Sequence, residues 1–585
     1  MNTNLNTQTV QKNFSPSLNQ IREFKNHYDS VRVSSLGGFG DVTQNMFVYE
    51  FIPSGDLKKS QIIIVDCGAG FPEEDTFGVD LQIPDTHYLE DKKDRILGIF
   101  ISHGHEDHIG AIRFVLPILG LNIPIYAPRL AAAFIQARLA ETKINANIQI
   151  YDDDTPPISK GPFVVDPVRV THSVPDTYHL SISTPIGVFY HGSDFKFDVF
   201  PMFGKPADLN HIARIGDKKV VCLLSDCLGA DSQGFSPSER SLADKFKQEI
   251  VSAKGRVFVT SISSNIVRWG QAIEYARSVG RKIVGVGMSI DRAINVAKEL
   301  GYLTISNSDL VPVERIKNFP DDKLIFLVAG FAGQPDSALS KMIMGKHRIK
   351  IKSGDKVIFS APDYIPGTTS KINVMIDNLS KMGAEVSYGD EKIHVSGHGY
   401  QKEHAILIDL LKPKFLLPIG GNYRHIKAYQ SIAKNLGYKD DQLINPDIDS
   451  AITFNGNGSV DTKFHHSLKK VLIDGLGVGD VGTTVLRDRK ILAEDGMFSV
   501  ILLVNSQNGK LTKDPVILSK GFVFVKQHGD LIAYLTKETI TKFNRVTSTP
   551  ANFEFISQQL QAHLETIIQQ KTGRQPMVLP LVIEV

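Results

Sequence analysis

The sequence predicts an α/β protein of about three domains, in which a doubly wound parallel layer is inserted into the first domain. Three observations support this prediction. The 585-residue chain is too long for a single hydrophobic core. Apolar segments with His or Asp at their ends precede residue 226, and alternating strand and helix patterns follow it. A His-containing segment returns at Ile393–Gly399, which indicates that the chain re-enters the first domain there.

The first ordered strands are expected after an N-terminal tail. Residues 1–27 are rich in Asn, Thr, Gln and Ser, a composition typical of disorder. Apolar runs predict strands at Met46–Phe51, at Gln61–Val65 and at Ile96–Ile101. The second of these runs ends in Asp66 and glycines, where the backbone can turn sharply beside a site.

Directly after the third strand lies the segment His103-Gly-His105-Glu-Asp107-His108. Alternate residues of an extended segment point the same way, so His103 and His105 can share one metal ion. The turn that follows brings Asp107 and His108 towards a second ion. Imidazole and carboxylate groups at about 2.0–2.2 Å are ordinary ligands of Zn²⁺, and Mn²⁺ accepts the same set. The segment therefore predicts two adjacent metal sites.

Two later predicted strands also end in candidate ligands. They lie at Val168–Thr171 and Gly187–His191, and they lead to His172 and Asp194. Strand ends that are far apart in the sequence often meet to assemble a functional site. We expect His172 to complete the first metal site and Asp194 to bridge both ions. Asp66 is expected to orient a histidine from behind.

The remaining divisions follow changes in pattern. Strand patterns followed by helix patterns, such as Arg256–Thr260 before Ile266–Val279, predict a parallel layer. A Gly-rich turn at Asn455–Ser459 suggests a linker, and a long polar helix pattern lies near Phe553–Lys571. The expected divisions are a tail at 1–27, a first domain at 28–230 and 391–455, an inserted domain at 231–390, a linker at 456–478 and a small C-terminal α+β domain at 479–585.

Composition restricts the compartment and the partners. The net charge is only +2, so a nucleic-acid partner would need a local basic surface. No apolar run approaches the ~18 residues that span a bilayer, and the first ten residues do not form a secretory signal, so we expect no membrane partner. Three cysteines give no disulfide framework, which favours the cytoplasm. Cys222 and Cys227 are expected to be buried apolar residues.

Taken together, the motifs resemble those of ribonuclease J, in the β-CASP group of the metallo-β-lactamase superfamily. The similarity covers nearly everything after residue 30. It involves His103–Gly110, Thr171–Asp176, Ser193–Asp198, Ser225–Asp226, Gly234–Arg240, Ser264–Asn265, His394–His398, Leu486–Gly496 and Arg574–Pro580. The resemblance implies a metallo-β-lactamase αββα sandwich, an inserted β-CASP domain and a C-terminal domain that small-molecule lactamases and lactonases lack.

The resemblance also implies an activity. The chain would hydrolyse single-stranded RNA during mRNA decay and rRNA processing, as a 5′→3′ exonuclease that can also act as an endonuclease. Two Zn²⁺ ions, or Mn²⁺ or Mg²⁺ in their place, would activate the attacking water. Asp107, Asp226 and His398 would be catalytic, with Asp226 orienting His398 so that it stabilises or protonates the leaving oxygen. His394 and Ser396 would contact RNA.

The chain departs from the family pattern near the expected cleft. Gly420 stands where the family has a metal-binding histidine, which predicts a weaker second metal site. His425 follows about one helical turn later and is expected to face the wrong way to replace that histidine. The other departures are Phe331 and Ala332 in a loop that is usually polar, Val267 in place of a histidine and Tyr400 in place of a serine. Together these changes resemble a divergent paralogue with reduced or altered activity.

A basic strip at Lys341–Lys352, which includes Lys346 and Arg348, is open to two interpretations. It could contact RNA phosphates in a salt-dependent way, or it could be an ordinary solvated surface. Two functions likewise remain open. The first is the ribonuclease, as a homodimer or heteromer. The alternative is a weakly active or inactive RNA-binding subunit that scaffolds an active ribonuclease J paralogue. A small-molecule metallohydrolase is disfavoured, because it has no use for the inserted and C-terminal domains.

Overall fold

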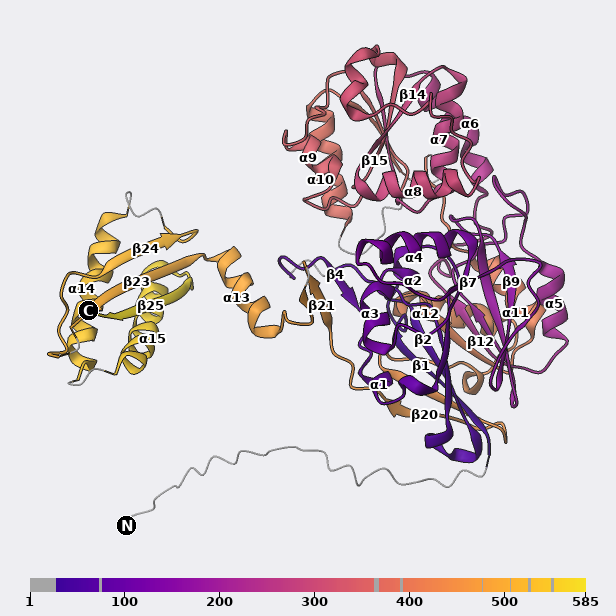
Figure 1. Ribbon diagram of the computed structural model, residues 1–585, viewed down its shortest axis with the longest axis horizontal. Coiled ribbons are helices and arrows are strands. Elements are labelled where there is room, and N and C mark those ends of the chain that lie inside the picture. Colours follow the sequence, from indigo (N-terminus) through magenta and orange to yellow (C-terminus); the bar gives the residue numbers. More distant parts are fainter. Residues whose placement is uncertain are drawn as a thin grey trace.

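The computed structural model has a two-sheet first domain, an inserted five-stranded domain and a separate C-terminal lobe (Figure 1). It describes residues 28–72, 76–361, 368–389, 393–475, 477–505, 507–523, 528–548 and 552–585. The tail expected at residues 1–27 lies outside this description. No helix within the described ranges is long and apolar enough to cross a membrane.

The first sheet of the first domain has eight strands. In spatial order they are β20 (Val460–His465), β19 (Ser450–Asn455), β1 (Ser30–Gly37), β2 (Met46–Ile52), β3 (Gln61–Val65), β5 (Ile96–Phe100), β6 (Ile125–Pro128) and β7 (Ile148–Tyr151). From β3 to β7 the strands are parallel, and β3 and β5 are almost fully buried. Strands covered on both faces need continuous apolar runs, which explains the sequences of β3 and β5.

The second sheet has six strands and packs against the first. In spatial order they are β18 (Phe415–Ile419), β12 (Val220–Asp226), β11 (Gly187–Gly192), β10 (Thr177–Thr184), β9 (Phe163–Val170) and β8 (Ile158–Lys160). Val33, Phe100, Leu180 and Phe189 are among the buried side chains that fill the space between the sheets. Cys222 lies in the same core and Cys227 in the neighbouring one, both fully buried, as the sequence predicts.

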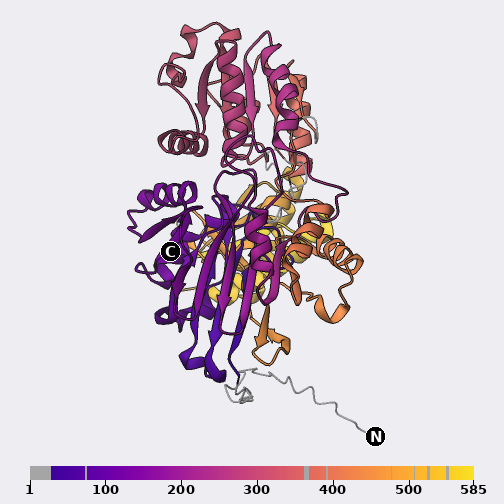
Figure 2. The same ribbon diagram turned by 90° about the vertical axis from the view of Figure 1, so that its right-hand side faces the viewer.

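Helices cover the outer faces of both sheets and complete the αββα arrangement (Figure 2). On the first sheet they are α1 (His87–Glu90), α2 (Glu106–Ile109), α3 (Ile112–Leu119) and α4 (Arg129–Glu141). On the second they are α5 (Leu209–Gly216), α11 (Gln401–Leu411) and α12 (Tyr423–Asn435). The predicted sandwich is confirmed.

The inserted domain leaves the second sheet after β12 and returns to it before β18. These two strands are parallel neighbours, with Asp226 opposite Ile419. The inserted sheet is entirely parallel, in the order β14 (Lys282–Val286), β15 (Leu324–Val328), β13 (Val257–Thr260), β16 (Lys356–Phe359) and β17 (Glu385–Ser387). Its helices are α6 (Ala243–Val251), α7 (Ile266–Ser278), α8 (Met288–Glu299), α9 (Ala338–Ile343) and α10 (Thr369–Lys381). They pack in two separate cores, so the doubly wound prediction is confirmed.

The inserted domain rests on the first domain through α8 and α4, which share one hydrophobic core. Arg292 of α8 pairs with Glu141 of α4. The hydroxyl of Tyr302 donates a hydrogen bond to Asp176, which follows β9. These contacts bring the carboxyl ends of the inserted strands near the segment that carries the predicted metal ligands.

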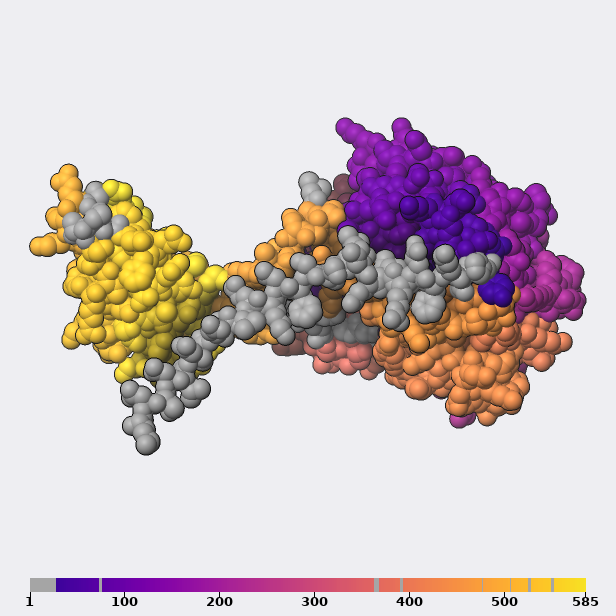
Figure 3. Space-filling view, turned by 90° about the horizontal axis from the view of Figure 1, so that it is seen from below, coloured from indigo at the N-terminus to yellow at the C-terminus, as the bar shows by residue number. Residues whose placement is uncertain are grey.

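The C-terminal domain is a lobe beside the rest of the molecule (Figure 3). Its sheet has the order β24 (Val516–Lys520), β23 (Met497–Val504) and β25 (Met577–Glu584), and α14 (Gly529–Val546) and α15 (Phe553–Thr572) cover one face. Helix α13 (Thr483–Glu494) precedes the lobe, and its Arg489 pairs with Asp474 at 2.5 Å.

The sequence predicts a linker at residues 456–478, but the structure has strands there. Within it, β20 forms the edge of the large sheet, and β21 (Val471–Asp474) pairs with β4 (Leu81–Ile83) and β22 (Gly477–Val478). The edge strand β20 is mostly exposed and polar, so it carries little of the apolar signal that identifies a strand.

Gly68, in the loop after β3, provides a test of how tightly this loop packs against the metal-bearing segment that contains Asp107. An added Cβ at Gly68 would lie 1.6 Å from the carbonyl oxygen of Asp107. We expect Gly68→Ala to destabilise the first domain by about 3 kcal/mol or more, because backbone must move to relieve the clash. Calorimetric unfolding midpoints would measure this. Gly529→Ala is the control, because open space surrounds Gly529. An equal effect of the two substitutions would contradict the expectation.

Candidate metal centre

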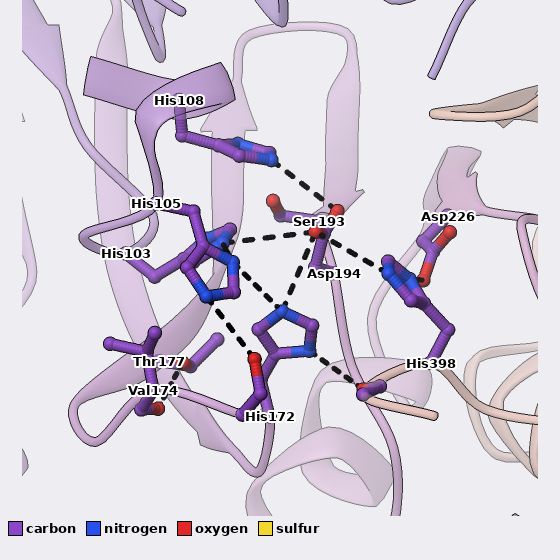
Figure 4. Close-up of polar contacts among 12 residues, drawn as sticks. His103, His105, His108, His172, Val174, Thr177, Ser193, Asp194, Asp226 and His398 are labelled. Carbon is purple, nitrogen blue, oxygen red and sulfur yellow. Dashed lines mark hydrogen bonds and ion pairs between the residues drawn. The ribbon is translucent and has the colours of Figure 1, made fainter. Parts of the chain in front are cut away.

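The predicted ligands meet at the ends of strands from both sheets. His103, His105 and His108 lie on the loop and short helix after β5, His172 follows β9, and Asp194 follows β11. Figure 4 shows these side chains pointing towards one another. All are buried or nearly so, with Asp194 7% exposed. The convergence anticipated from the sequence is therefore present in the structure.

One set of side chains, which we call the first metal group, consists of His103, His105, His172 and Asp194. Their nearest ligand atoms lie within 4.8 Å of one another. Nδ1 of His105 is 3.1 Å from Nε2 of both His103 and His172. Oδ2 of Asp194 is 3.7 Å from Nε2 of His103 and 3.6 Å from Nε2 of His172. Three imidazoles and one carboxylate at this spacing suit a divalent ion.

The second metal group consists of Asp107, His108 and Asp194. Nε2 of His108 lies 3.5 Å from Oδ2 of Asp107 and 3.4 Å from Oδ1 of Asp194. Asp194 therefore offers one carboxylate oxygen to each group, as expected of a bridging ligand. The two groups together fit a pair of divalent ions.

Hydrogen bonds behind the imidazoles fix which nitrogen faces the centre. Nδ1 of His108 is 2.7 Å from Oδ2 of Asp66. Oδ2 also accepts a hydrogen bond from the hydroxyl of Ser102, and Oδ1 accepts one from the backbone N–H of Ser102. Nδ1 of His172 donates to the carbonyl of Gly397 at 2.7 Å. The hydroxyl of Ser173 lies 3.1 Å from Nε2 of His105. Such partners orient metal-binding imidazoles, and Asp66 occupies the position expected for it.

The charges are arranged so that a cation is favoured at the second group. Burial lowers the pKa values of His103 and His105, and that of His172 to about 4, which keeps these imidazoles neutral. Burial also acts to lower the pKa of His108, but Asp194, Asp107 and Asp66 outweigh it and raise that pKa. A position that stabilises a proton on a buried imidazole also attracts a metal ion.

His398 and Asp226 form a second pair beside Asp194. Nδ1 of His398 lies 2.8 Å from Oδ2 of Asp226, and its Nε2 faces Oδ2 of Asp194 at 4.0 Å (Figure 4). Burial lowers the pKa of His398, but the charges of Asp226 and Asp194 outweigh burial and raise it to about 9. This imidazole is therefore held protonated beside the centre at neutral pH.

Gly420 lies next to this pair without a side chain. Its φ is +66°, a left-handed conformation that favours glycine, and an added Cβ would lie 3.7 Å from Oδ1 of Asp226. His425 does not take its place: its Nδ1 accepts a hydrogen bond from the backbone of Asn422, and its Nε2 lies 3.6 Å from Asp231. His425 thus caps α12, in agreement with the direction expected from the sequence.

The four predicted RNA-binding residues are not brought together. Ser396 accepts a hydrogen bond from the backbone of His398 and lies beside the centre. His394 is buried at 4% exposure, near Arg268 and Lys196. Arg348 pairs with Glu314 at 2.6 Å and lines a separate hollow of the inserted domain. Lys346 is exposed on the same loop as Arg348. The structure does not bring Lys346 and Arg348 to the metal groups.

A hollow of about 500 Å³ lies between the first and inserted domains. Gly104 and Glu106 from the metal-bearing loop line it, together with Arg138 and Arg292. Phe331 lines the opposite side, so this departure from the family pattern does face the interdomain cleft.

Sequence reasoning missed Asn45, which lies in the loop between β1 and β2. Its Nδ2 is 3.2 Å from Nε2 of His108 and 3.5 Å from Oδ2 of Asp107. Asn45 is 2% exposed. A single Asn after a Gly-rich loop carries no spacing signal, so only the fold reveals its place.

Comparisons with known proteins agree with this architecture. Family models match for the "Metallo-beta-lactamase superfamily" at residues 40–199, the "Ribonuclease J, beta-CASP domain" at 254–379 and the "Ribonuclease J C-terminal domain" at 484–585. A crystal structure of a protein of unknown function from Enterococcus faecalis shares the fold at 15% identity, with a TM-score of 0.50 over 74% of this chain and all of that one.

Curated relatives match along nearly the whole length. Ribonuclease J2 of Bacillus subtilis is 33% identical over 96% of this chain and 100% of its own. Ribonuclease J 1 of Streptococcus pyogenes is also 33% identical, over 95% and 98%. Ribonuclease J 2 of Staphylococcus aureus is 30% identical over the same shares. Because this identity extends across all three domains, the chain belongs to the ribonuclease J family.

Proposed function

We propose that this protein is a metal-dependent ribonuclease that hydrolyses single-stranded RNA, as a 5′→3′ exonuclease with an additional endonuclease activity, in RNA decay and processing. The observation that carries the proposal is the pair of metal groups that share Asp194, with the Asp226–His398 pair directed at the same carboxylate. The names of the relatives support RNA as the substrate. The cytoplasm remains the expected location.

The first metal group would hold one ion and the second group the other, with Asp194 between them. Zn²⁺ is the proposed metal, and Mn²⁺ or Mg²⁺ are the alternatives. Such a pair supplies a nucleophilic water at neutral pH and neutralises charge on a phosphoryl group. Asp66 holds His108 in the orientation that this arrangement needs.

The chain's own acid would be His398. Asp226 holds Nδ1, so Nε2 is directed towards the shared carboxylate and any phosphodiester beside it. A protonated imidazole there can donate its proton to the leaving oxygen, a step worth about 10²–10⁴-fold. Ser396, next to His398, is the proposed RNA contact near the scissile bond, and His394 would support this segment from within. For Lys346 and Arg348, contact with RNA further along the inserted domain remains a proposal.

The second candidate function is an RNA-binding subunit of weak or no activity that scaffolds an active paralogue. Gly420 favours it, since the second metal group lacks one imidazole. The C-terminal sheet also presents an apolar outer face suited to self-association or to a heteromer. One row of this face contains Val516, Ile501 and Leu581, and Leu581 is 51% exposed.

The first prediction from the proposed function separates the ribonuclease from the scaffold. Purified protein with Mn²⁺ should degrade 5′-monophosphorylated single-stranded RNA, and Asp107→Ala should lower the rate at least 10²-fold, because the second group loses a carboxylate. Gly420→His should raise the rate if the missing imidazole limits activity. Gel electrophoresis of end-labelled RNA would measure both. RNA left intact by the parent but cleaved by Gly420→His would favour the scaffold.

The second prediction concerns pH. His398 donates only while protonated, so activity should decline on the alkaline side as this imidazole loses its proton; its pKa is about 9 in the metal-free protein, and bound divalent cations lower it. Asp226→Asn removes the largest of the three charges that raise this pKa, so the alkaline limb of kcat/KM should move to lower pH. In the metal-free protein, His398 contributes stability that is complete below about pH 6.5 and is lost as the pH rises through about 9. An unmoved alkaline limb in Asp226→Asn would exclude His398 as the acid.

The third prediction concerns assembly. Leu581→Lys places a charge in the apolar face of the C-terminal sheet, so the mass in solution should fall towards that of the monomer. Light scattering after size-exclusion chromatography would measure the mass. Leu121→Lys is the matched control, because Leu121 is 47% exposed on the first domain. If Leu581→Lys left an oligomer intact, another surface would have to hold it together.

A further inference from the structure

We infer that the carboxamide of Asn45 is part of the second metal position and makes that position an oxygen-rich site for a hard divalent cation such as Mn²⁺ or Mg²⁺. The inference rests on the proposed function, because it concerns the same pair of ions. It adds a ligand that the metal motifs do not contain and a difference in metal preference between the two positions.

The backbone of Asn45 is held by the loops that build the site. Its N–H donates to the carbonyl of Asp107 at 2.9 Å, and its carbonyl accepts from the N–H of Gly68 at 2.9 Å. These bonds tie the loop between β1 and β2 to the turn after β3 and to α2. The side chain is therefore placed relative to Asp107 and His108 by main-chain contacts on both sides.

The terminal amide atom lies where a ligand would lie. Nε2 of His108 has three polar atoms around it. It is 3.2 Å from Nδ2 of Asn45, 3.4 Å from Oδ1 of Asp194 and 3.5 Å from Oδ2 of Asp107. Two ligand atoms that each lie about 2.1 Å from the same metal ion are about 3.0–3.5 Å from each other. The carboxamide thus occupies one corner of the arrangement that the second metal group leaves incomplete.

The atom that faces an ion would be the amide oxygen. A half-turn about the last side-chain bond exchanges Nδ2 and Oδ1 within the same volume. In the structure Nδ2 faces His108 and has two acceptors, the carboxylate of Asp107 at 3.5 Å and the backbone carbonyl of Val42 at 3.3 Å. A cation at the centre reverses this preference, because the amide dipole then favours oxygen towards the positive charge.

Glycine at position 38 leaves the room that this amide needs. An added Cβ at Gly38 would lie 2.7 Å from Oδ1 of Asn45. The carbonyl of Gly38 accepts a hydrogen bond from the N–H of Gly420 at 2.9 Å. Asn45 and Gly420, the position without a side chain, therefore both adjoin Gly38.

The two positions then differ in chemistry. The first group offers three imidazole nitrogens and one carboxylate oxygen. With Asn45, the second offers one imidazole nitrogen and three oxygens. Nitrogen-rich sites suit Zn²⁺, whereas carboxylate and carbonyl oxygens suit Mn²⁺ and Mg²⁺. A centre with Zn²⁺ in the first position and an exchangeable harder ion in the second follows from this donor set.

The test is metal binding by the full chain, independent of RNA cleavage. Metal-free protein is loaded with one equivalent of Zn²⁺ and titrated with Mn²⁺, and free Mn²⁺ is followed by electron paramagnetic resonance. Asn45→Ala should weaken Mn²⁺ binding about 10- to 100-fold and leave the first Zn²⁺ equivalent bound. Asn45→Asp should bind Mn²⁺ at least as tightly as the parent, because both of its terminal atoms can face the ion. Asn552→Ala, at the cap of α15 in the C-terminal domain, should match the parent.

Three outcomes would overturn the inference. They are an Asn45→Ala affinity within twofold of the parent, an Asn45→Asp affinity as weak as that of Asn45→Ala, and a Zn²⁺-loaded parent that binds no Mn²⁺. The second would mean that Asn45 only holds its own loop through Nδ2. Circular dichroism verifies folding, and the isosteric Asp variant keeps the test valid if Asn45→Ala unfolds. Intact RNA alongside two bound ions would instead contradict the proposed ribonuclease and leave the role of Asn45 standing.

Discussion

The carboxylate of Asp66 is the contact on which the rest of the centre depends. It sits at the end of β3 with a φ of +61°, and it accepts hydrogen bonds from the backbone and hydroxyl of Ser102 at the end of β5. The same carboxylate holds Nδ1 of His108. One buried side chain thus joins two neighbouring parallel strands and fixes the direction of an imidazole. A strained backbone angle persists only where several such bonds determine it.

The imidazole of His108, which Asp66 orients, lies beside Asp194, and Asp194 in turn lies beside the Asp226–His398 pair. Asp194 would be costly to bury alone, but His108 and His398 lie beside it, and their charges hold its pKa well below the usual value despite burial. The three imidazoles of the first group are kept neutral by burial instead. The site therefore combines neutral imidazoles, which can bind a metal without losing a proton, with a carboxylate that is ionised before any metal arrives.

Local spacing was enough to predict His103, His105, Asp107 and His108, because six consecutive residues on one loop cannot lie far apart. Asp66, His172 and Asp194 followed from the rule that parallel strands deliver side chains to a common edge. The sequence could not reveal Asn45, because its place depends on how three loops meet. It also could not reveal β20, whose polar residues lie at a sheet edge, or where the basic strip around Arg348 faces. Arg348 is paired with Glu314, a partner 34 residues away that no local pattern indicates.

The unequal metal groups bear on both candidate functions. The first group is held from behind by hydrogen bonds to three of its imidazoles, involving Ser102, Ser173 and Gly397. The second has one imidazole, and Gly420, in a left-handed conformation beside Asp226, offers no side chain to it. A site with fewer fixed ligands loses its ion first as the cation concentration falls. Activity of this chain would then follow the supply of the second ion. On this reasoning, the two proposed functions, ribonuclease and scaffold, would differ in whether the second position holds its ion.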